Sequence, residues 1–200
     1  MLSMLKPKAE LQDLFERGTD LPATGRFHQT LTFNNFKQQN QADLKNLYDR
    51  VSEMSPTMHE IFNKYLFEIA PNGHNPISES QIDRYLKNFF LAERNDEYVD
   101  QTLKFFNLLR ENRFEPGKLI VVFNQFSFYI TTHVLHHFGM KPHIAFKYMK
   151  SVSAAVNIEQ ELLIEVMTER LLEKVIEELA SLTDANANIM YMKDLIQRLD

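Results

Sequence analysis

Residues 116–139 read PGKLIVVFNQFSFYITTHVLHHFG. The proline at the start and the glycine at the end, where a helix favours a left-handed residue, are typical of the two ends of one helix. Apolar residues between them fall on nearly every face, as in a buried helix, and polar residues interrupt the stretch too often for a membrane span. We therefore expect the central helix of a helical domain, with an inward series of Leu119, Val122, Phe123, Phe126, Ile130 and Val134.

The composition of the whole chain fits that expectation. Of its 200 residues, 44% are hydrophobic, which is enough to bury a core. The five glycines and seven prolines fall mostly between periodic segments, which favours long helices over short strands. We predict an all-α fold.

Charge and cysteine content narrow the classes of function. The net charge is -5 and there is no basic stripe with interleaved aromatic residues, so we expect no nucleic-acid partner. The absence of cysteine excludes disulfides and cysteine-based metal or redox sites. Lysines and a proline interrupt the first residues, which therefore lack the apolar run of a signal peptide. We expect a cytoplasmic protein that is not transmembrane.

The periodic pattern divides the chain into three parts. Residues 42–169 form the main domain, and residues 170–200 form a coiled-coil signalling helix or linker. One very long helix, beginning after a break at residues 139–142, joins these two parts. Residues 1–41 are the least regular and are expected to form an arm that lies on the domain, anchored by Phe27, Leu31, Phe33 and Phe36.

Capping signals mark helix starts inside the domain. Ser55 before Pro56 indicates one start, with serine as the cap and proline at the first helical position. Ser78 with Gln81 fits a capping box, and Asn95 indicates the start of the next helix. These starts predict successive helices that lead into the central one.

Residues 170–200 carry a heptad pattern with Asn186 at an a position and Lys193 at the next one. A single buried Asn commonly fixes the register of a two-stranded coiled coil, so we predict a parallel homodimer. The alternative is a monomeric amphipathic helix that folds back on its own domain. The sequence reaches Asp200 without a helix-ending glycine, which favours continuation into an output or signalling domain. The predicted seam consists of Leu172, Val175, Leu179, Leu182, Asn186, Ile189 and Ile196.

Residues that could carry catalysis do not converge in the sequence. There is no glycine-rich phosphate loop and no G-x-S-x-G motif, so we expect no enzyme. His133 and His137 lie four apart and could face one metal ion, but two imidazoles make half a site and equally fit histidines near a helix C-terminus. We interpret the acidic residues along the last helix as a solvated face: Glu159, Glu161, Glu165 and Glu169.

Sixteen phenylalanines and nine methionines distinguish the composition. Methionine side chains adapt to irregular shapes, so this composition suits a flexible apolar pocket. A tightly packed core without a ligand is the equal alternative.

The run SQIDRYLKNFFLAERNDEYVDQTLKFFNLLRENRFEPGKLIVVFNQF, residues 80–126, resembles the sensor globins, the globin-fold input domains of heme-based aerotaxis transducers and related globin-coupled sensors. The shared pattern is a helix, a turn with an acidic-aromatic pair, a further helix and then a proline, here Pro116, that opens a long helix. The run SAAVNIEQELLIEVMTE, residues 153–169, resembles the last globin helix of that family. The resemblance implies a globin-like sensor fold within residues 42–169, with a C-terminal helix that leads to a chemotaxis-type signalling domain.

The functional residues of the family are replaced in this chain. The position of its proximal histidine falls on Leu109, which cannot ligate iron, and that of its distal tyrosine on Asn63. The family includes heme-free members that bind a fatty acid, so the resemblance implies no cofactor here and a small apolar ligand such as a fatty acid. The ligand pocket is expected to be lined by Phe62, Asn63, Tyr65, Leu66, Phe89, Phe106, Leu109, Leu119, Val122, Phe123 and Phe126.

The resulting hypothesis is a sensory domain without heme that dimerises and relays a signal along its last helix. One alternative is a heme-binding gas sensor that uses an unconventional axial ligand. Another is an interaction module that antagonises a signalling kinase without any ligand.

Overall fold

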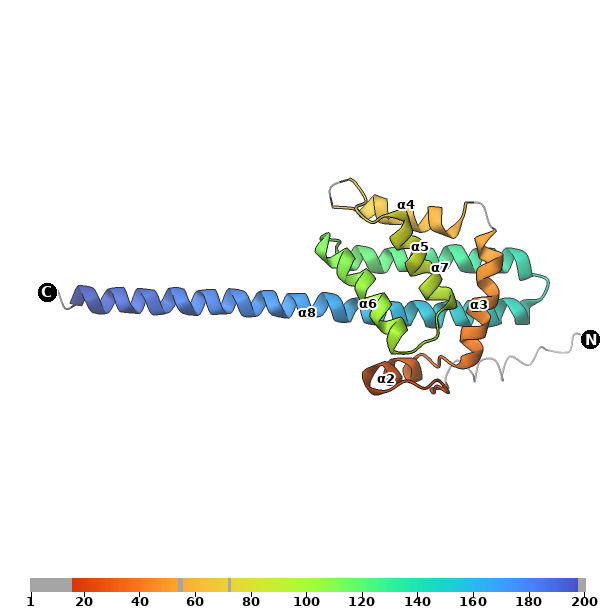
Figure 1. The fold of residues 1–200 in the computed structure, drawn as a ribbon, viewed down its shortest axis with the longest axis horizontal. Helices are drawn as coiled ribbons and strands as arrows, with labels where there is room; N and C mark the ends of the chain where they lie inside the picture. Colours follow the sequence, from red (N-terminus) through yellow and green to blue (C-terminus); the bar gives the residue numbers. More distant parts are fainter. Residues whose placement is uncertain (1–15, 54–55, 72, 198–200) are drawn as a thin grey trace, which may run out of the picture.

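The computed structural model describes residues 16–53, 56–71 and 73–197. Within these ranges the chain forms helices and connecting segments and no strand, which confirms the all-α prediction. The helices, labelled in Figure 1, are α2 (Gly25–Phe33), α3 (Gln38–Ser52), α4 (Met58–Ile69), α5 (Glu79–Leu91), α6 (Asp96–Glu111), α7 (Pro116–Phe138) and α8 (Pro142–Gln197).

Two long helices form the frame of the molecule. Figure 1 shows α7 and α8 running side by side in opposite directions, with α3, α5 and α6 crossing them. Helix α4 packs against α7 and α5, and α2 packs against α8. Because α8 is much longer than α7, it continues beyond the domain as a single projecting helix.

The capping predictions are confirmed for α5 and changed for α4. Ser78 and Gln81 form the expected capping box at the start of α5. Helix α4 starts later than expected, because Thr57 is its N-cap: the hydroxyl of Thr57 accepts from the backbone N–H of Glu60, whose carboxylate accepts from the Thr57 backbone N–H at 2.7 Å.

The region expected to be an irregular arm contains helix α2 and the start of α3. Phe27 and Leu31 of α2 are buried in the core with Phe36, as expected, whereas Phe33 is exposed. Polar contacts to α8 also hold α2, from Arg26 to Glu165 at 2.6 Å and from Thr30 to Glu161 at 2.7 Å. Helix α2 therefore packs on the domain, and the predicted boundary at residue 42 falls inside α3.

Helix α7 buries the expected inward series but is not covered on all sides. Val121, Phe128 and Leu135 are exposed by 55%, 69% and 50%, since α4 and α8 pack against the other faces. The glycine after α7 also differs from expectation. Gly139 has a φ of -56°, which is not left-handed, and a Cβ there would lie 2.7 Å from the Leu135 carbonyl oxygen. Close approach of the backbone therefore explains this glycine.

Helix α8 contributes to the core as far as Met167. Beyond that residue it extends roughly 45 Å, at 1.5 Å per residue. Among the described residues, no helix combines the length and the hydropathy required to cross a bilayer.

Candidate functional site

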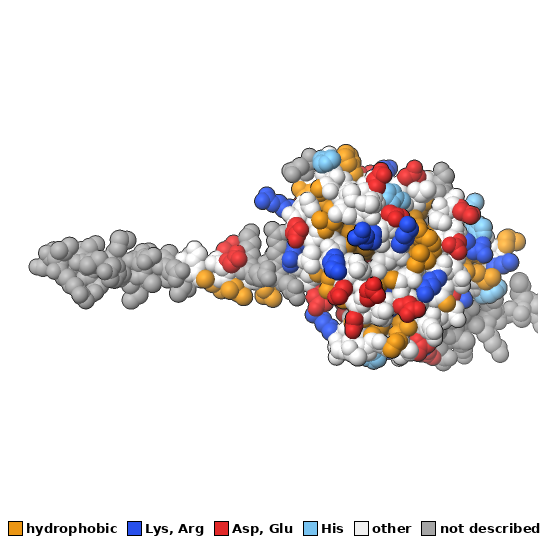
Figure 2. Space-filling view, viewed as in Figure 1, with side chains coloured by type: hydrophobic (Ala, Val, Ile, Leu, Met, Phe, Trp, Pro, Cys, Tyr) orange, Lys and Arg blue, Asp and Glu red, His pale blue; other side chains and the backbone are white. Residues whose placement is uncertain are grey.

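A groove of about 880 Å³ lies between α5 and α6. The two helices run antiparallel because only residues 92–95 join them, and the side-chain amide of Asn88 donates to the Thr102 hydroxyl at 3.1 Å across the pair. Figure 2 shows this face, where basic and hydrophobic side chains lie close together over α5 and α6. The groove is lined by Gln81, Arg84, Tyr85, Lys87, Asn88, Leu91, Ala92, Glu97, Gln101, Lys104, Phe105, Asn107, Leu108 and Glu111.

The floor of the groove is aromatic. The rings of Tyr85 and Phe105 stack with their centroids 4.2 Å apart and their planes 12° apart. Both side chains are buried, while Leu91 and Leu108 present further apolar surface nearer to solvent. The floor can therefore hold an apolar group by van der Waals contact.

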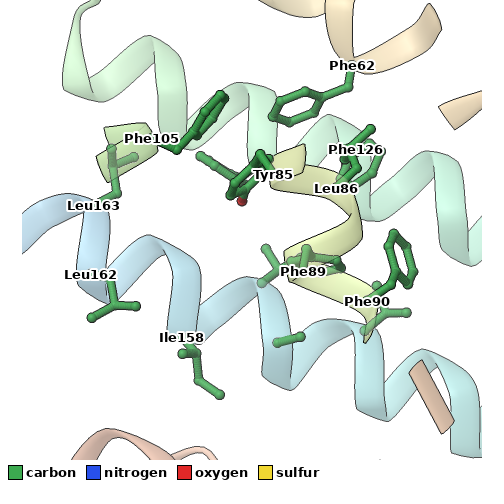
Figure 3. Packing of buried hydrophobic residues seen from close by; sticks show 14 of the residues in the cluster. Phe62, Tyr85, Leu86, Phe89, Phe90, Phe105, Phe126, Ile158, Leu162 and Leu163 are labelled. Carbon is green, nitrogen blue, oxygen red and sulfur yellow. The ribbon is translucent and has the colours of Figure 1, made fainter. Parts of the chain in front are cut away.

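The hydroxyl group of Tyr85 connects this floor to α8. It donates a hydrogen bond of 2.8 Å to Oε2 of Glu159, and Tyr98 donates to the other carboxylate oxygen. Glu159 is fully buried. In Figure 3 the Tyr85 ring lies between the rings of Phe62 and Phe105, with its oxygen directed toward α8. The groove and the long helix therefore share one hydrogen-bonded cluster.

The interpretation of the acidic residues of α8 as a solvated face is wrong for Glu159. Glu159 occurs at the three- and four-residue spacing of the buried α8 series, four positions before Leu163, so the helical period predicts that it points inward. Glu161 and Glu165 lie at the edge that contacts α2, and the side chain of Glu169 lies outside the described residues. The sequence thus held a signal for a buried carboxylate.

Burial raises the pKa of Glu159, because the charged form loses its hydration, while hydrogen bonds from Tyr98 and Tyr85 and the charge of Arg94 oppose that rise. Burial also raises the pKa values of Tyr85 and Tyr98 well above their usual range, and the neighbouring carboxylate adds to the rise. Both phenols therefore keep their protons and act as hydrogen-bond donors to Glu159.

A buried cation balances this carboxylate. The guanidinium of Arg94 donates to the backbone carbonyls of Phe89 at 2.6 Å and Ala92 at 3.1 Å, and it lies 4.2 Å from the centroid of the Tyr98 ring. Its own backbone N–H donates to the side chain of Gln41 at 3.1 Å. Burying one charge alone is costly, so the two opposite charges joined through Tyr98 stabilise each other.

Comparison with known proteins adds no identification. No protein-family model matches the sequence, and no curated protein matches it.

Most of the predicted pocket residues form the packed centre of the domain. The ring centroid of Phe62 lies 5.0 Å from that of Phe126 and 6.0 Å from that of Phe123. Asn63 and Tyr65 are half-buried, and Asn63 lines a separate surface pocket of about 420 Å³. The buried members are Phe62, Leu66, Phe89, Phe106, Leu109, Leu119, Val122, Phe123 and Phe126, and none of them lines the groove between α5 and α6. An internal ligand pocket stays a prediction.

The two histidines considered for metal binding lie near the end of α7. His133 is half-buried, and its ring meets the Tyr129 ring edge-on at 4.5 Å, whereas His137 is exposed. Burial lowers the pKa of His133, and the charge of His136 adds to this effect. Within the described ranges, no group of three or more His, Asp or Glu side chains is arranged to hold a metal ion.

Three residues of the predicted seam are exposed on the projecting part of α8. They are Leu172, Val175 and Leu179, at 59%, 51% and 57% exposure, and Ile176 beside them is 65% exposed. Figure 2 shows a row of hydrophobic side chains along one side of this helix. The side chains of the other seam residues lie outside the described residues: Leu182, Asn186, Ile189 and Ile196.

Proposed function

We propose that this chain is a sensory or regulatory domain with a globin-like sensor fold that responds to a small apolar ligand, without heme. In this proposal the chain forms a homodimer, and α8 carries the signal to an output domain or partner. The role is binding and relay rather than catalysis. The resemblance of residues 80–126 to the sensor globins supports this relation.

The observation that carries this proposal is the hydrogen bond between Tyr85 and Glu159. Tyr85 lines the groove, and Glu159 belongs to the helix that leaves the domain. A ligand can shift a conformational equilibrium only if it binds one state more tightly than the other. A ligand that moves Tyr85 changes the hydrogen bonding of a buried carboxylate, so groove occupancy and the position of α8 are energetically coupled.

Exposed apolar residues on both long helices support the dimer. Leu172 and Val175 lie on one side of the projecting part of α8, and exposed apolar residues of α7 occur every seven positions, at Val121, Phe128 and Leu135. Burying a fully exposed Leu or Val contributes roughly 1.5–3 kcal/mol, so pairing these surfaces stabilises a dimer.

The proposal is tested with the full chain in three measurements. Multi-angle light scattering gives the oligomeric state, native mass spectrometry reveals a co-purified apolar ligand, and a visible absorbance spectrum after growth with a heme precursor reports heme. We expect a dimer, a bound organic molecule and no Soret band, because Leu109 cannot ligate iron. A monomer with no bound molecule contradicts the proposal.

A Soret band in stoichiometric amount would instead support the gas-sensor alternative. In that case Leu109→His tests the assumed alignment, because a histidine placed at the position of the proximal ligand strengthens heme binding. If the variant gains no heme affinity, the assignment of Leu109 to that position is wrong.

The packed interior favours a second candidate, an interaction module that antagonises a signalling kinase without a ligand. In the centre of the domain the ring of Phe62 packs against those of Phe123 and Phe126, and the ring of Phe123 also packs against that of Phe106. This candidate predicts a dimer whose stability does not respond to added apolar molecules.

A further inference from the structure

Basic side chains surround the middle of the α5–α6 groove. Arg84 and Lys87 line it from α5, and Lys104 lines it from α6. Arg84 and Lys104 line the same groove as the stacked rings of Tyr85 and Phe105, which form its floor. Positive charge therefore gathers from two helices next to apolar surface.

The counter-ions within the chain leave part of this charge uncompensated. Lys87 pairs with Asp83 at 2.8 Å, but among the described residues no ion pair engages Arg84 or Lys104. The two carboxylates that line the groove, Glu97 and Glu111, belong to the first and last turns of α6, at opposite ends of the helix. An anion near the middle would thus gain two charge-assisted contacts.

The size of the groove suits an elongated molecule. Its lining on α5 extends from Gln81 to Leu91, which is roughly 15 Å at 1.5 Å per residue. Its volume of about 880 Å³ falls in the usual range for small-molecule sites. Leu91 and Leu108 continue the apolar surface of the floor along this length.

We propose that this groove binds an anionic amphiphile, with a carboxylate or phosphate-monoester head between Arg84 and Lys104 and its hydrocarbon chain along Tyr85, Phe105 and Leu108. The inference rests on the proposed sensory function and deepens it, because it names the charge of the ligand and places it in the groove rather than in the packed interior. The head forms ion pairs with side chains from both helices. The hydrocarbon chain contacts the ring stack that ends at Glu159.

Isothermal titration of the full chain with four probes tests the proposal. The probes are decanoate, decyl phosphate, decyltrimethylammonium and inorganic phosphate, each below its micelle concentration. We expect both decyl anions to bind once per chain and at least about tenfold more tightly than either the decyl cation or inorganic phosphate. Tighter binding of decanoate would indicate a fatty acid as the natural ligand, and tighter binding of decyl phosphate would indicate a lipid phosphate.

Two charge-matched variants locate the site. The double variant Arg84→Gln with Lys104→Gln should weaken decyl-anion binding by about tenfold. The control, Lys64→Gln with Lys118→Gln, removes two exposed cations from α4 and α7 and should leave the affinity unchanged. A third variant, Leu108→Glu, adds a carboxylate to the lining and should weaken the decyl anions while sparing the cation.

The proposal is overturned if the decyl cation binds as tightly as the decyl anions, if no decyl probe binds, or if the two double variants lose equal affinity. Measuring both ligand binding and the oligomeric state distinguishes failure of this proposal from failure of the proposed function. A dimer that binds no amphiphile refutes the ligand assignment alone, whereas a monomer that binds one with the expected selectivity refutes the dimeric relay alone.

Discussion

Replacing Tyr85 with Phe removes one hydroxyl group and leaves the ring stacked on Phe105. The lost hydrogen bond measures 2.8 Å and reaches the buried carboxylate of Glu159. Hydrogen bonds to charged groups contribute about 1.5–3 kcal/mol when both partners are protein groups. We therefore expect Tyr85→Phe to lower the free energy of unfolding at neutral pH by about 2 kcal/mol. In a chain of this size such a loss lowers Tm by about 4–8 °C.

Urea titration followed by circular dichroism measures this loss, with Tyr48→Phe as the control. Tyr48 is half-buried against Phe90, and its hydroxyl makes no hydrogen bond within the described residues. In acid, where Glu159 is protonated, the effect of Tyr85→Phe should fall to about 1 kcal/mol, because the hydrogen bond then joins neutral groups. If Tyr85→Phe costs no more than Tyr48→Phe at neutral pH, the reasoning about the buried carboxylate is refuted.

Three further changes test other parts of the structure. Burial raises the pKa of Glu159, so the folded state holds this proton more tightly than the unfolded chain does, and this contribution to stability falls as pH rises from near 4.5 through the folded pKa. Glu159→Gln cannot titrate at this position. In urea titrations, the free energy of unfolding of the variant should therefore increase relative to that of the unsubstituted protein as pH rises. A difference that stays constant with pH would contradict the raised pKa. Leu172→Asp with Val175→Asp should weaken the proposed dimer by at least about 100-fold in sedimentation equilibrium, whereas Ser181→Asp on the opposite side of α8 should not. Gly139→Ala should lower the free energy of unfolding by about 1–2 kcal/mol in urea titration, because its Cβ meets a carbonyl oxygen at 2.7 Å, and a more stable variant would show that the α7–α8 turn relaxes freely.

Local patterns in the sequence predicted the parts of the fold that depend on local physics. The capping box of Ser78 and Gln81 and the inward series of α7 were correct, because capping and helical period act within a few residues. Helix α2 was missed because it has only nine residues and opens with Gly25, a poor helix former. The buried side chains of Phe27 and Leu31 show that tertiary packing stabilises this helix.

The candidate site depends on contacts between distant parts of the chain. Nothing near Tyr85 in the sequence indicates that its ring stacks on Phe105 or that its hydroxyl reaches α8. Glu159 is different, because its position in the helical period indicates burial, but its charge led to the wrong prediction of solvent exposure. The sequence did not indicate which side of α7 is exposed, at Val121 and Phe128, because apolar residues occur on nearly every face of that helix.

The uninterrupted course of α8 makes it a lever arm. The sequence contains no glycine or proline after Pro142, and these are the usual causes of helix kinks. With roughly 45 Å of helix beyond Met167, a tilt of about 5° at the domain displaces the far end by roughly 4 Å. In the proposed relay, a rearrangement around Glu159 too small to disturb the packed core would therefore be amplified mechanically into a larger displacement at the far end of the helix.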